Sequence, residues 1–315
     1  MKILLITQGY SRVVVPLCAS RHQVVGILES DSRRPASHNR PLFRMGKWLY
    51  HVYKGGRADL QSQCREKSVP YRLMQSSDDD GLVDWIRSKS PDAIVVFSMS
   101  HLLKRNIFDI PPLGTINLHP SYLPDYRGPN PCFWQYYHCD LNPGVTVHYV
   151  NEQEDAGDII FQERLLIEKG IRSPDCLDRL IGHLGVQLTL KALDAMERGD
   201  APRVPQPTSS PTARARNIRP EEHATIIKWH EWDGERVWHV LRGTESWIDA
   251  LPRPRGWFSG NRWRIGDFEK IHALNGIPGE LFKSGGSYFV ATKDGRIGLE
   301  TVFDLKQMIV SALDR

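Results

Sequence analysis

The sequence predicts an α/β domain with a Rossmann-like, mostly parallel sheet, followed by a smaller, mostly β domain. First, short apolar segments alternate with helix-like segments over residues 1–201, and strands without a polar face are typical of parallel sheets covered on both sides. Second, a proline-rich stretch at 202–211 ends this alternation. Third, residues 212–315 are rich in tryptophan and in turns. We therefore expect two domains, 1–201 and 212–315, joined by a linker.

The strands of the first domain are expected where apolar residues follow one another without interruption. The predicted strands are 2–7, 23–28, 92–97, 115–119, 144–150 and 158–166. Helices are expected where apolar residues recur at spacings of three and four, and these segments are 13–19, 78–89 and 174–198. Because ligands bind outside the carboxyl ends of strands in such sheets, residues at these ends are candidates for function.

The second domain is expected to consist of short strands and one helix. The prolines of residues 202–211 disfavour both helix and sheet, so this stretch is predicted to be the linker. Beyond it, glycine-containing turns at 284–286 and 293–295 separate strand-like segments, and a helix is expected near 234–241. The tryptophans are most simply the core, because a small domain needs bulky side chains to bury enough surface.

Composition excludes several classes of protein. The 315 residues are 40% hydrophobic and 25% charged, which is typical of globular chains, and no apolar run reaches the about 18 residues of a membrane helix. The first residues resemble a strand rather than a signal peptide, so a cytoplasmic location is expected. The five cysteines lack metal-binding spacing, and no metal is expected. The net charge of +4 is compatible with an anionic substrate but too small to indicate nucleic acid.

A basic insertion interrupts the first domain at residues 33–57, where arginines and lysines are interleaved with aromatic side chains. The simplest interpretation is a long surface loop with one short helix. The alternative is a flap over an anionic ligand, with Arg33, Arg34 and Arg40 as substrate contacts.

Two polar residues end the predicted strand 115–119. Because side chains alternate along a strand, Asn117 and His119 project from the same face, whereas Leu118 points into a packed layer. Prolines follow at once and stiffen the chain behind them. Taken alone, a histidine at a strand end is more often structural than catalytic.

An acidic loop follows 36 residues after His119 (155 minus 119). Asp155 and Asp158 flank Gly157 between two predicted strands, and a carboxylate beside His119 would favour the charged imidazole and hold its orientation. An amide, an imidazole and a carboxylate in one cleft suit acyl transfer. No G-x-S-x-G nucleophile motif occurs, which favours direct transfer to an incoming nucleophile over an acyl-enzyme.

The stretch I-N-L-H-P-S-Y-L-P-D-Y-R-G-P-N-P (116–131), followed by G-V-T-V-H-Y-V-N-E-Q-E-D-A-G-D-I-I (144–160), resembles the folate-dependent formyltransferase family. The order and spacing of the two motifs make this resemblance specific. It covers residues 1 to about 200 well and continues less strictly at 220–230 and 278–282, which are similar to the second domain of longer family members.

The resemblance implies the formyltransferase fold, an OB-like second domain, and transfer of the formyl group of N10-formyltetrahydrofolate to an amine. By motif position, the catalytic residues are Asn117, His119 and Asp155. The first two would stabilise the oxyanion, Asp155 would orient and charge His119, and His119 or Asp155 would accept the amine proton. The implied folate contacts are Phe97, Ser98, Met99, Leu103, Asp155 and Asp158.

Family members differ in the amine that they formylate. Chain length argues against glycinamide ribonucleotide, and three features favour a nucleotide-linked amino sugar, such as a dideoxy amino sugar of a surface polysaccharide pathway, over methionyl-tRNA. These features are Y-R-G-P-N-P-C-F-W at 126–134, T-Q-G-Y at 7–10 and W-H at 229–230. Arg127 and Trp134 would then contact the sugar nucleotide.

Other functions stay open. The basic insertion at 33–57 favours methionyl-tRNA, which would need several phosphate contacts. A formyltetrahydrofolate hydrolase, or a binding module that keeps the fold without activity, is also compatible with the motifs. The second domain can alternatively serve to form a homodimer.

Overall fold

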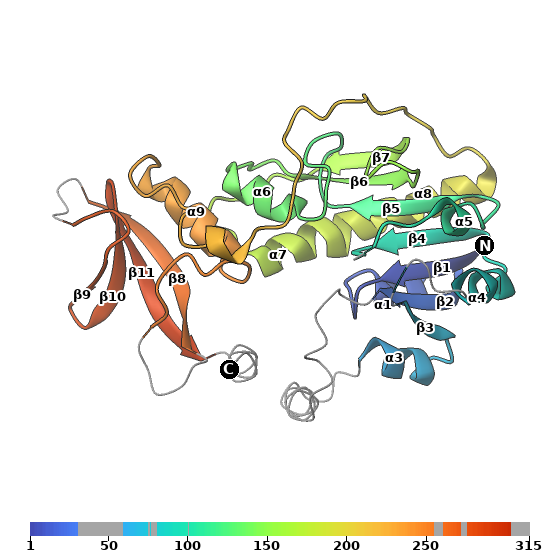
Figure 1. The fold of residues 1–315 in the computed structure, drawn as a ribbon, viewed down its shortest axis with the longest axis horizontal. Coiled ribbons are helices and arrows are strands. Elements are labelled where there is room, and N and C mark those ends of the chain that lie inside the picture. The colour runs from blue at the N-terminus through green and yellow to red at the C-terminus, as the bar shows by residue number, and fades with distance from the viewer. Residues whose placement is uncertain are drawn as a thin grey trace.

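Two sheets organise the chain, one in each half (Figure 1). The computed structural model describes residues 1–30, 59–74, 76, 81–99, 101–254, 261–271 and 276–303. Within these residues a seven-stranded sheet is followed by a four-stranded antiparallel sheet. The predicted α/β domain with a smaller, mostly β domain behind it is confirmed. No helix among the described residues is long and apolar enough to cross a bilayer.

The seven-stranded sheet has the order β3-β2-β1-β4-β5-β6-β7. Its strands are β1 (Lys2–Thr7), β2 (Gln23–Ser30), β3 (Tyr71–Met74), β4 (Ala93–Phe97), β5 (Thr115–His119), β6 (Gly144–Tyr149) and β7 (Ile159–Arg164). The first five pair in parallel, and β6 and β7 pair antiparallel. All six predicted strands are confirmed within two residues at each end. The short strand β3 was not predicted, because four residues are too few to display an apolar run.

Helices cover both faces of this sheet. The helices of the first domain are α1 (Val14–Cys18), α3 (Leu60–Glu66), α4 (Leu82–Lys89), α5 (Arg105–Phe108), α6 (Pro131–Tyr137), α7 (Ser173–Leu177) and α8 (Val186–Arg198). One face packs against α1, α3 and α8, and the other packs against α4 and α5. Residues 77–80, at the start of the helix predicted for 78–89, lie outside the described residues. Burial on both faces explains why the strands carry no polar stripe.

The helix predicted for 174–198 contains a π-helical segment, η2 (Asp178–Gly185), between α7 and α8. This segment packs against the strand that carries the candidate catalytic residues. A Cβ atom at Gly185 would lie 3.1 Å from Cδ2 of Leu118. Apolar periodicity predicts the helix but does not distinguish α from π hydrogen bonding, so the widened turn was not predicted.

The second domain has one helix on a four-stranded sheet. Its elements are the 3₁₀ turn η3 (Pro220–Glu222), α9 (Gly234–Thr244), β8 (Asn261–Lys270), β9 (Leu281–Ser284), β10 (Ser287–Thr292) and β11 (Gly295–Phe303). The predicted helix at 234–241 is confirmed and extends to Thr244. As expected, tryptophans belong to the core, where Trp232 is buried and several others are partly buried. Phe133 of α6, in the first domain, is fully buried in this same core.

A mostly buried ion pair joins the two domains. Nη1 of Arg172, just before α7, lies 2.5 Å from Oε1 of Glu245, just after α9. The guanidinium also donates to the carbonyl oxygen of Ile265, whose N–H donates to the other oxygen of Glu245. Both charged groups therefore have additional hydrogen-bond partners across the junction, which is the condition for a stable buried pair.

Candidate active site

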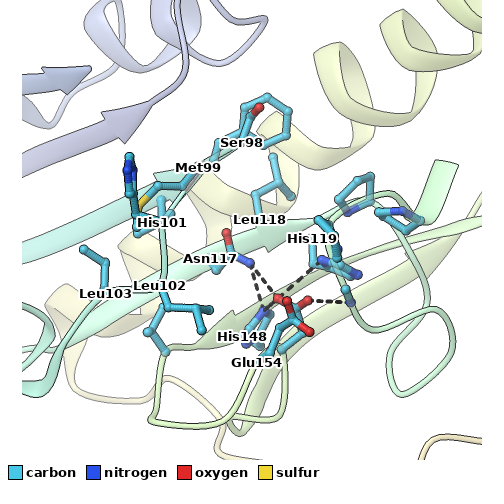
Figure 2. A pocket seen from close by; sticks show the side chains of 18 of the residues that line it. Ser98, Met99, His101, Leu102, Leu103, Asn117, Leu118, His119, His148 and Glu154 are labelled. Atoms are coloured by element: carbon cyan, nitrogen blue, oxygen red, sulfur yellow. Dashed lines mark hydrogen bonds and ion pairs between the residues drawn. The ribbon is translucent and has the colours of Figure 1, made fainter. Parts of the chain in front are cut away.

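A cavity of about 760 Å³ opens where β4 and β5 end (Figure 2). One part of its lining is apolar and includes Phe97, Met99 and Leu103. Another part is polar and consists of side chains from β5, β6 and the loop after β6, among them Asn117, His119, His148 and Asp155. The position agrees with the rule that ligands bind outside the carboxyl ends of parallel strands.

Strand β5 presents two polar side chains to this cavity. Asn117 and His119 both line it, while Leu118 belongs to the apolar core that also contains η2. The alternation predicted from the sequence is thus present. Because Leu118 is held by η2, the orientation of its two neighbours is fixed by packing on the opposite face of the sheet.

Asp155 brings a carboxylate to the same place. Its Oδ1 lies 3.3 Å from Nδ2 of Asn117, 3.5 Å from Nδ1 of His119 and 3.7 Å from Nε2 of His148. Its Oδ2 accepts a hydrogen bond of 2.9 Å from the backbone N–H of Gly128. The structure therefore brings together the amide, imidazole and carboxylate that the two sequence motifs indicated.

A hydrogen bond from Nε2 to the loop after β5 holds the His119 ring in place. Nε2 donates to the carbonyl oxygen of Tyr126 at 3.1 Å, because a carbonyl can only accept. This bond leaves Nδ1 on the side of Asp155. A proton on Nδ1 is therefore shared between the carboxylate and any acceptor that enters the cavity.

His148 is a site residue that the sequence interpretation missed. It lies on β6 directly opposite Asn117 and is almost fully buried. Burial lowers the pKa of His148 to about 4, so the ring is neutral at pH 7. Its Nδ1–H donates to the carbonyl oxygen of Tyr149 at 2.8 Å, which leaves Nε2 as an acceptor for the Asn117 amide at 3.2 Å. No sequence signal indicated it, because only the antiparallel pairing of β5 with β6 places this histidine opposite Asn117.

These contacts define the orientation of the Asn117 amide. Nε2 of His148 and Oδ1 of Asp155 are both acceptors, so only the amide nitrogen can face them. Figure 2 shows this nitrogen directed at the two side chains and the amide oxygen on the other side. The nitrogen lies at the cavity floor between the carboxylate and the histidine.

Two glycines allow the loops to approach this closely. Gly128 has a φ of +125°, and a Cβ atom there would lie 2.9 Å from the carbonyl oxygen of Ala215. A Cβ atom at Gly157 would lie 1.9 Å from the carbonyl oxygen of Tyr149. A side chain at Gly128 would push its loop away from the segment at Ala215, and one at Gly157 would push the acidic loop away from the end of β6.

The other predicted site residues divide into three groups. Phe97, Ser98, Met99 and Leu103, which were predicted as folate contacts, line the cavity, whereas Asp158 is not among the lining residues and lies 4.0 Å from Arg203. Arg127 and Trp134 also do not line it: the first bonds to residues 206–208, and the second packs on the core of the second domain. Arg33, Arg34 and Arg40 lie outside the described residues. The cavity is also lined by charged or polar residues that were not predicted, among them Glu154, Arg214 and Asn217.

One group of potential metal ligands occurs among the described residues, formed by His22, Asp194 and Glu197. Arg21 lies 2.8 Å from Asp194 and 2.6 Å from Glu197, and the amino group of Met1 lies 2.7 Å from Glu197. Cationic groups of the chain thus already neutralise these carboxylates, and the cluster is explained as an ion-pair network.

Known proteins that are similar in sequence to this chain are formyltransferases. Residues 56–193 match the family model described as formyl transferase. The methionyl-tRNA formyltransferase of Syntrophus aciditrophicus is 38% identical over 206 residues, which are 65% of this chain and 63% of that protein, so the chain spans less than two thirds of that relative's length. The methionyl-tRNA formyltransferase of Alkaliphilus metalliredigens is 30% identical over 242 residues, 74% of this chain and 71% of that protein.

A solved structure matches the whole described fold. The N-formyltransferase of Helicobacter canadensis, crystallised with folinic acid and dTDP-3-aminofucose, has a TM-score of 0.62 and 12% identity. The match covers 96% of this chain and 100% of that chain. At this identity the likeness shows a common fold.

Proposed function

Because the chain belongs to the formyl transferase family, we propose that it transfers the formyl group of N10-formyltetrahydrofolate to the amino group of a nucleotide-linked amino sugar. The observation that carries the proposal is the cluster at the cavity floor, where one carboxylate oxygen of Asp155 faces both the Asn117 amide and the His119 ring. Formyl transfer to an amine needs a hydrogen-bond donor to the oxyanion and, beside it, a group that accepts the proton of the amine. This cluster offers both.

The cavity suits the formyl donor. Its volume of about 760 Å³ is that of a small-molecule site, typically about 300–1,000 Å³. The apolar side chains of Phe97, Met99 and Leu103 would pack against a flat ring system, and the polar floor would receive the formyl end. The donor supplies an activated formyl group. The Helicobacter canadensis relative, crystallised with folinic acid, supports this assignment.

The side chains have distinct proposed roles. His119 would donate from Nδ1 to the negative charge that develops on the formyl oxygen, while Tyr126 holds the ring by its Nε2. Asn117 would donate to the same oxygen from its amide nitrogen, whose 3.3 Å contact with Asp155 is long enough to be exchanged for a shorter one. Asp155 would accept the proton that the amine loses when its nitrogen bonds to the formyl carbon, directly or through a water. It would return this proton to N10 as the bond between the formyl carbon and N10 breaks and tetrahydrofolate leaves.

A nucleotide-linked amino sugar is the proposed acceptor. The sequence features at 126–134, 7–10 and 229–230 favour it. The Helicobacter canadensis enzyme, crystallised with dTDP-3-aminofucose, matches over its entire length and so includes the second domain. Arg127 and Trp134 do not line the cavity, so this proposal does not depend on contacts from them.

Methionyl-tRNA is the second candidate acceptor. It is favoured by the sequence relatives, since the proteins 38% and 30% identical to this chain are methionyl-tRNA formyltransferases. The basic insertion at 33–57 would then contact RNA phosphates.

A direct assay separates these candidates. N10-formyltetrahydrofolate would be supplied with a panel of nucleotide-linked 3-amino and 4-amino sugars, with methionyl-tRNA, or with no amine. We expect turnover with a sugar nucleotide and none with tRNA. Turnover with tRNA alone would replace the sugar by tRNA as acceptor. Loss of the formyl group at equal rates with and without amine would indicate a hydrolase and overturn the transferase proposal.

A further inference from the structure

The segment between the two domains contacts both loops of the active site. It was predicted as a linker, but Val204 forms a backbone bridge with Ile159 at the start of β7. Residues 204–215, which we call the strap, then run back along the loops that carry Asp155 and Tyr126 before the chain enters the second domain (Figure 1). Its contacts are specific hydrogen bonds, most of them to backbone atoms of those loops.

Asp155 needs an external support for its backbone. Its φ is +52°, a left-handed conformation that costs a non-glycine residue free energy and persists only where surrounding contacts enforce it. The Gln206 side chain supplies such contacts. Its Nε2 donates to the carbonyl oxygen of Asp155 at 3.1 Å and to that of Gly157 at 2.7 Å. The side-chain amide of Gln206 therefore bridges the two ends of the turn 155–157, which sets the direction of the Asp155 carboxylate.

The same glutamine is anchored on the opposite loop. Its Oε1 accepts from Nη2 of Arg127 at 2.8 Å and from Nε at 3.3 Å. Arg127 immediately precedes Gly128, whose N–H binds the Asp155 carboxylate. Because the guanidinium can only donate and the two carbonyls can only accept, the orientation of the Gln206 amide is determined by chemistry.

The strap also supports the loop that holds His119. The Oγ1 of Thr212 accepts a hydrogen bond of 2.6 Å from the backbone N–H of Tyr126. The carbonyl oxygen of Tyr126 in turn accepts a hydrogen bond from Nε2 of His119. Ala215 donates to the carbonyl oxygen of Arg127 at 2.7 Å and accepts from Asn130 at 2.8 Å. Both partners of the Asp155–His119 pair are thus tied to one segment.

From these contacts we infer that Gln206 is a positioning residue that holds Asp155 against His119 through the strap. The inference rests on the proposed function, because it assigns Gln206 to the geometry of that reaction. Gln206 acts through the backbone of the acidic turn and does not line the cavity. Its loss should therefore lower kcat and leave the KM for the acceptor nearly unchanged.

The test compares two substitutions at one position. Gln206→Glu keeps an oxygen acceptor for Arg127 but loses the donor to Asp155 and Gly157, whereas Gln206→Ala loses both. We expect kcat to fall by about 10- to 100-fold in each, the scale of a misplacement of about 1 Å, with acceptor KM within about threefold. A role confined to anchoring the strap on Arg127 would instead make Gln206→Glu as active as the wild type, and this result would overturn the inference.

Gln162→Ala is the matched control. Gln162 also donates its side-chain amide to a backbone carbonyl, that of Leu123, at 3.3 Å, and among the described residues no side-chain hydrogen bond joins it to Asp155 or to the strap. We expect kcat within about threefold of wild type. A drop in Gln162→Ala equal to that in Gln206→Glu would attribute the effect to general loosening and overturn the inference.

A second measurement is independent of turnover. Amide hydrogen exchange of peptides covering 150–158 should accelerate in Gln206→Glu and not in Gln162→Ala. If the wild type formylates no amine of the panel, the proposed function fails, and hydrogen exchange alone decides the positioning role. Unchanged protection of 150–158 in Gln206→Glu would then overturn it.

Discussion

Nδ1 of His119 lies 3.5 Å from Oδ1 of Asp155, while Nε2 of the same ring donates to the carbonyl oxygen of Tyr126 at 3.1 Å. Both ring nitrogens face acceptors, so only a ring protonated on both can donate to both. In the proposed reaction, this arrangement would let the pair pass on the proton that the amine loses.

The first prediction concerns this pair. Asp155→Asn should lower kcat by at least about a hundredfold, because the amide neither accepts the amine proton nor favours the charged ring. His119→Ala should have an effect of the same order. The rate is measured under single turnover, with Asp200→Asn as a control that makes the same change of charge at an exposed site beside Arg198. Near-normal rates in both active-site variants would refute the proposed mechanism.

The second prediction concerns His148. His148→Leu removes the acceptor that fixes the Asn117 amide, so kcat should fall on the order of tenfold, less than for Asp155→Asn. Since burial lowers the pKa of His148 to about 4, the ring is already neutral above pH 5, and its loss should not move the pH midpoint of the rate. The measurement is kcat between pH 5 and 9. The lower limit lies about one pH unit above the pKa of His148, so this ring stays neutral throughout. A midpoint displaced by His148→Leu would mean that this ring titrates during the reaction.

The third prediction concerns the π-helical segment behind β5. Gly185→Ala would place a Cβ atom 3.1 Å from Cδ2 of Leu118 and 3.2 Å from the carbonyl oxygen of Leu180. Relief of this overlap should cost about 1–3 kcal/mol of stability and, by shifting Leu118, lower kcat on the order of tenfold.

Gly182→Ala is the control in the same segment. The nearest atom to a Cβ at this position is Cδ of Arg12 at 3.8 Å, an ordinary contact. Its free energy of unfolding should be unchanged or higher by up to about 1 kcal/mol, since alanine is the better helix former. Denaturant unfolding and kcat of the two variants are compared side by side. Equal behaviour of both would show that η2 does not support the catalytic strand.

The fourth prediction concerns pH and the second domain. His239 is fully buried, and its Nδ1 accepts from the N–H of Gly170 at 2.9 Å. Burial lowers the pKa of His239 to about 4, from the ordinary histidine value of 6.5. Between these values the unfolded chain binds a proton that the folded chain does not, so the contribution of this group to stability falls as the pH drops from 6.5 to 4.

His239→Asn isolates this effect, because it keeps an acceptor for Gly170 but does not titrate. We expect the wild type to lose free energy of unfolding between pH 7 and 5 more steeply than the variant, by up to about 1.4 kcal/mol per pH unit. Denaturant unfolding at several pH values between these limits gives both slopes. Parallel slopes would show that His239 is protonated equally in the folded and unfolded states.

Much of the fold could be predicted because a strand that is buried on both faces of its sheet appears in the sequence as a continuous apolar run. The residues of β4 are all apolar, whereas β5 places Asn117 and His119 around the apolar Leu118, so these two polar residues stand out. The acidic turn around Gly157 indicated Asp155, and the resemblance implied its catalytic role. The six predicted strands and the trio at the cavity floor follow from these local signals.

The features that could not be predicted depend on contacts between distant segments. His148 occurs in an ordinary-looking strand, and its role arises only from the antiparallel register that places it opposite Asn117. Trp134 was expected to contact a sugar nucleotide, but its indole N–H donates to the carbonyl oxygen of Arg216 and its ring packs on the second core. Gln206 lies among prolines, and these correctly indicated an irregular segment. They did not indicate that this segment contacts the loops that carry Asp155 and Tyr126.

The strap also has a consequence for modular design. The composition of the sequence predicts that the first domain ends at residue 201, yet residues up to Asn217 still line or support the cavity. A hybrid enzyme that took its second domain from a relative, with a junction at 201, would exchange the glutamine and threonine that hold the loops. A junction after 217 would carry them along intact. The unit to be kept whole is thus the first domain together with its strap, and a second domain joined after 217 would still have to reproduce the contacts that Phe133 and Arg172 make with it.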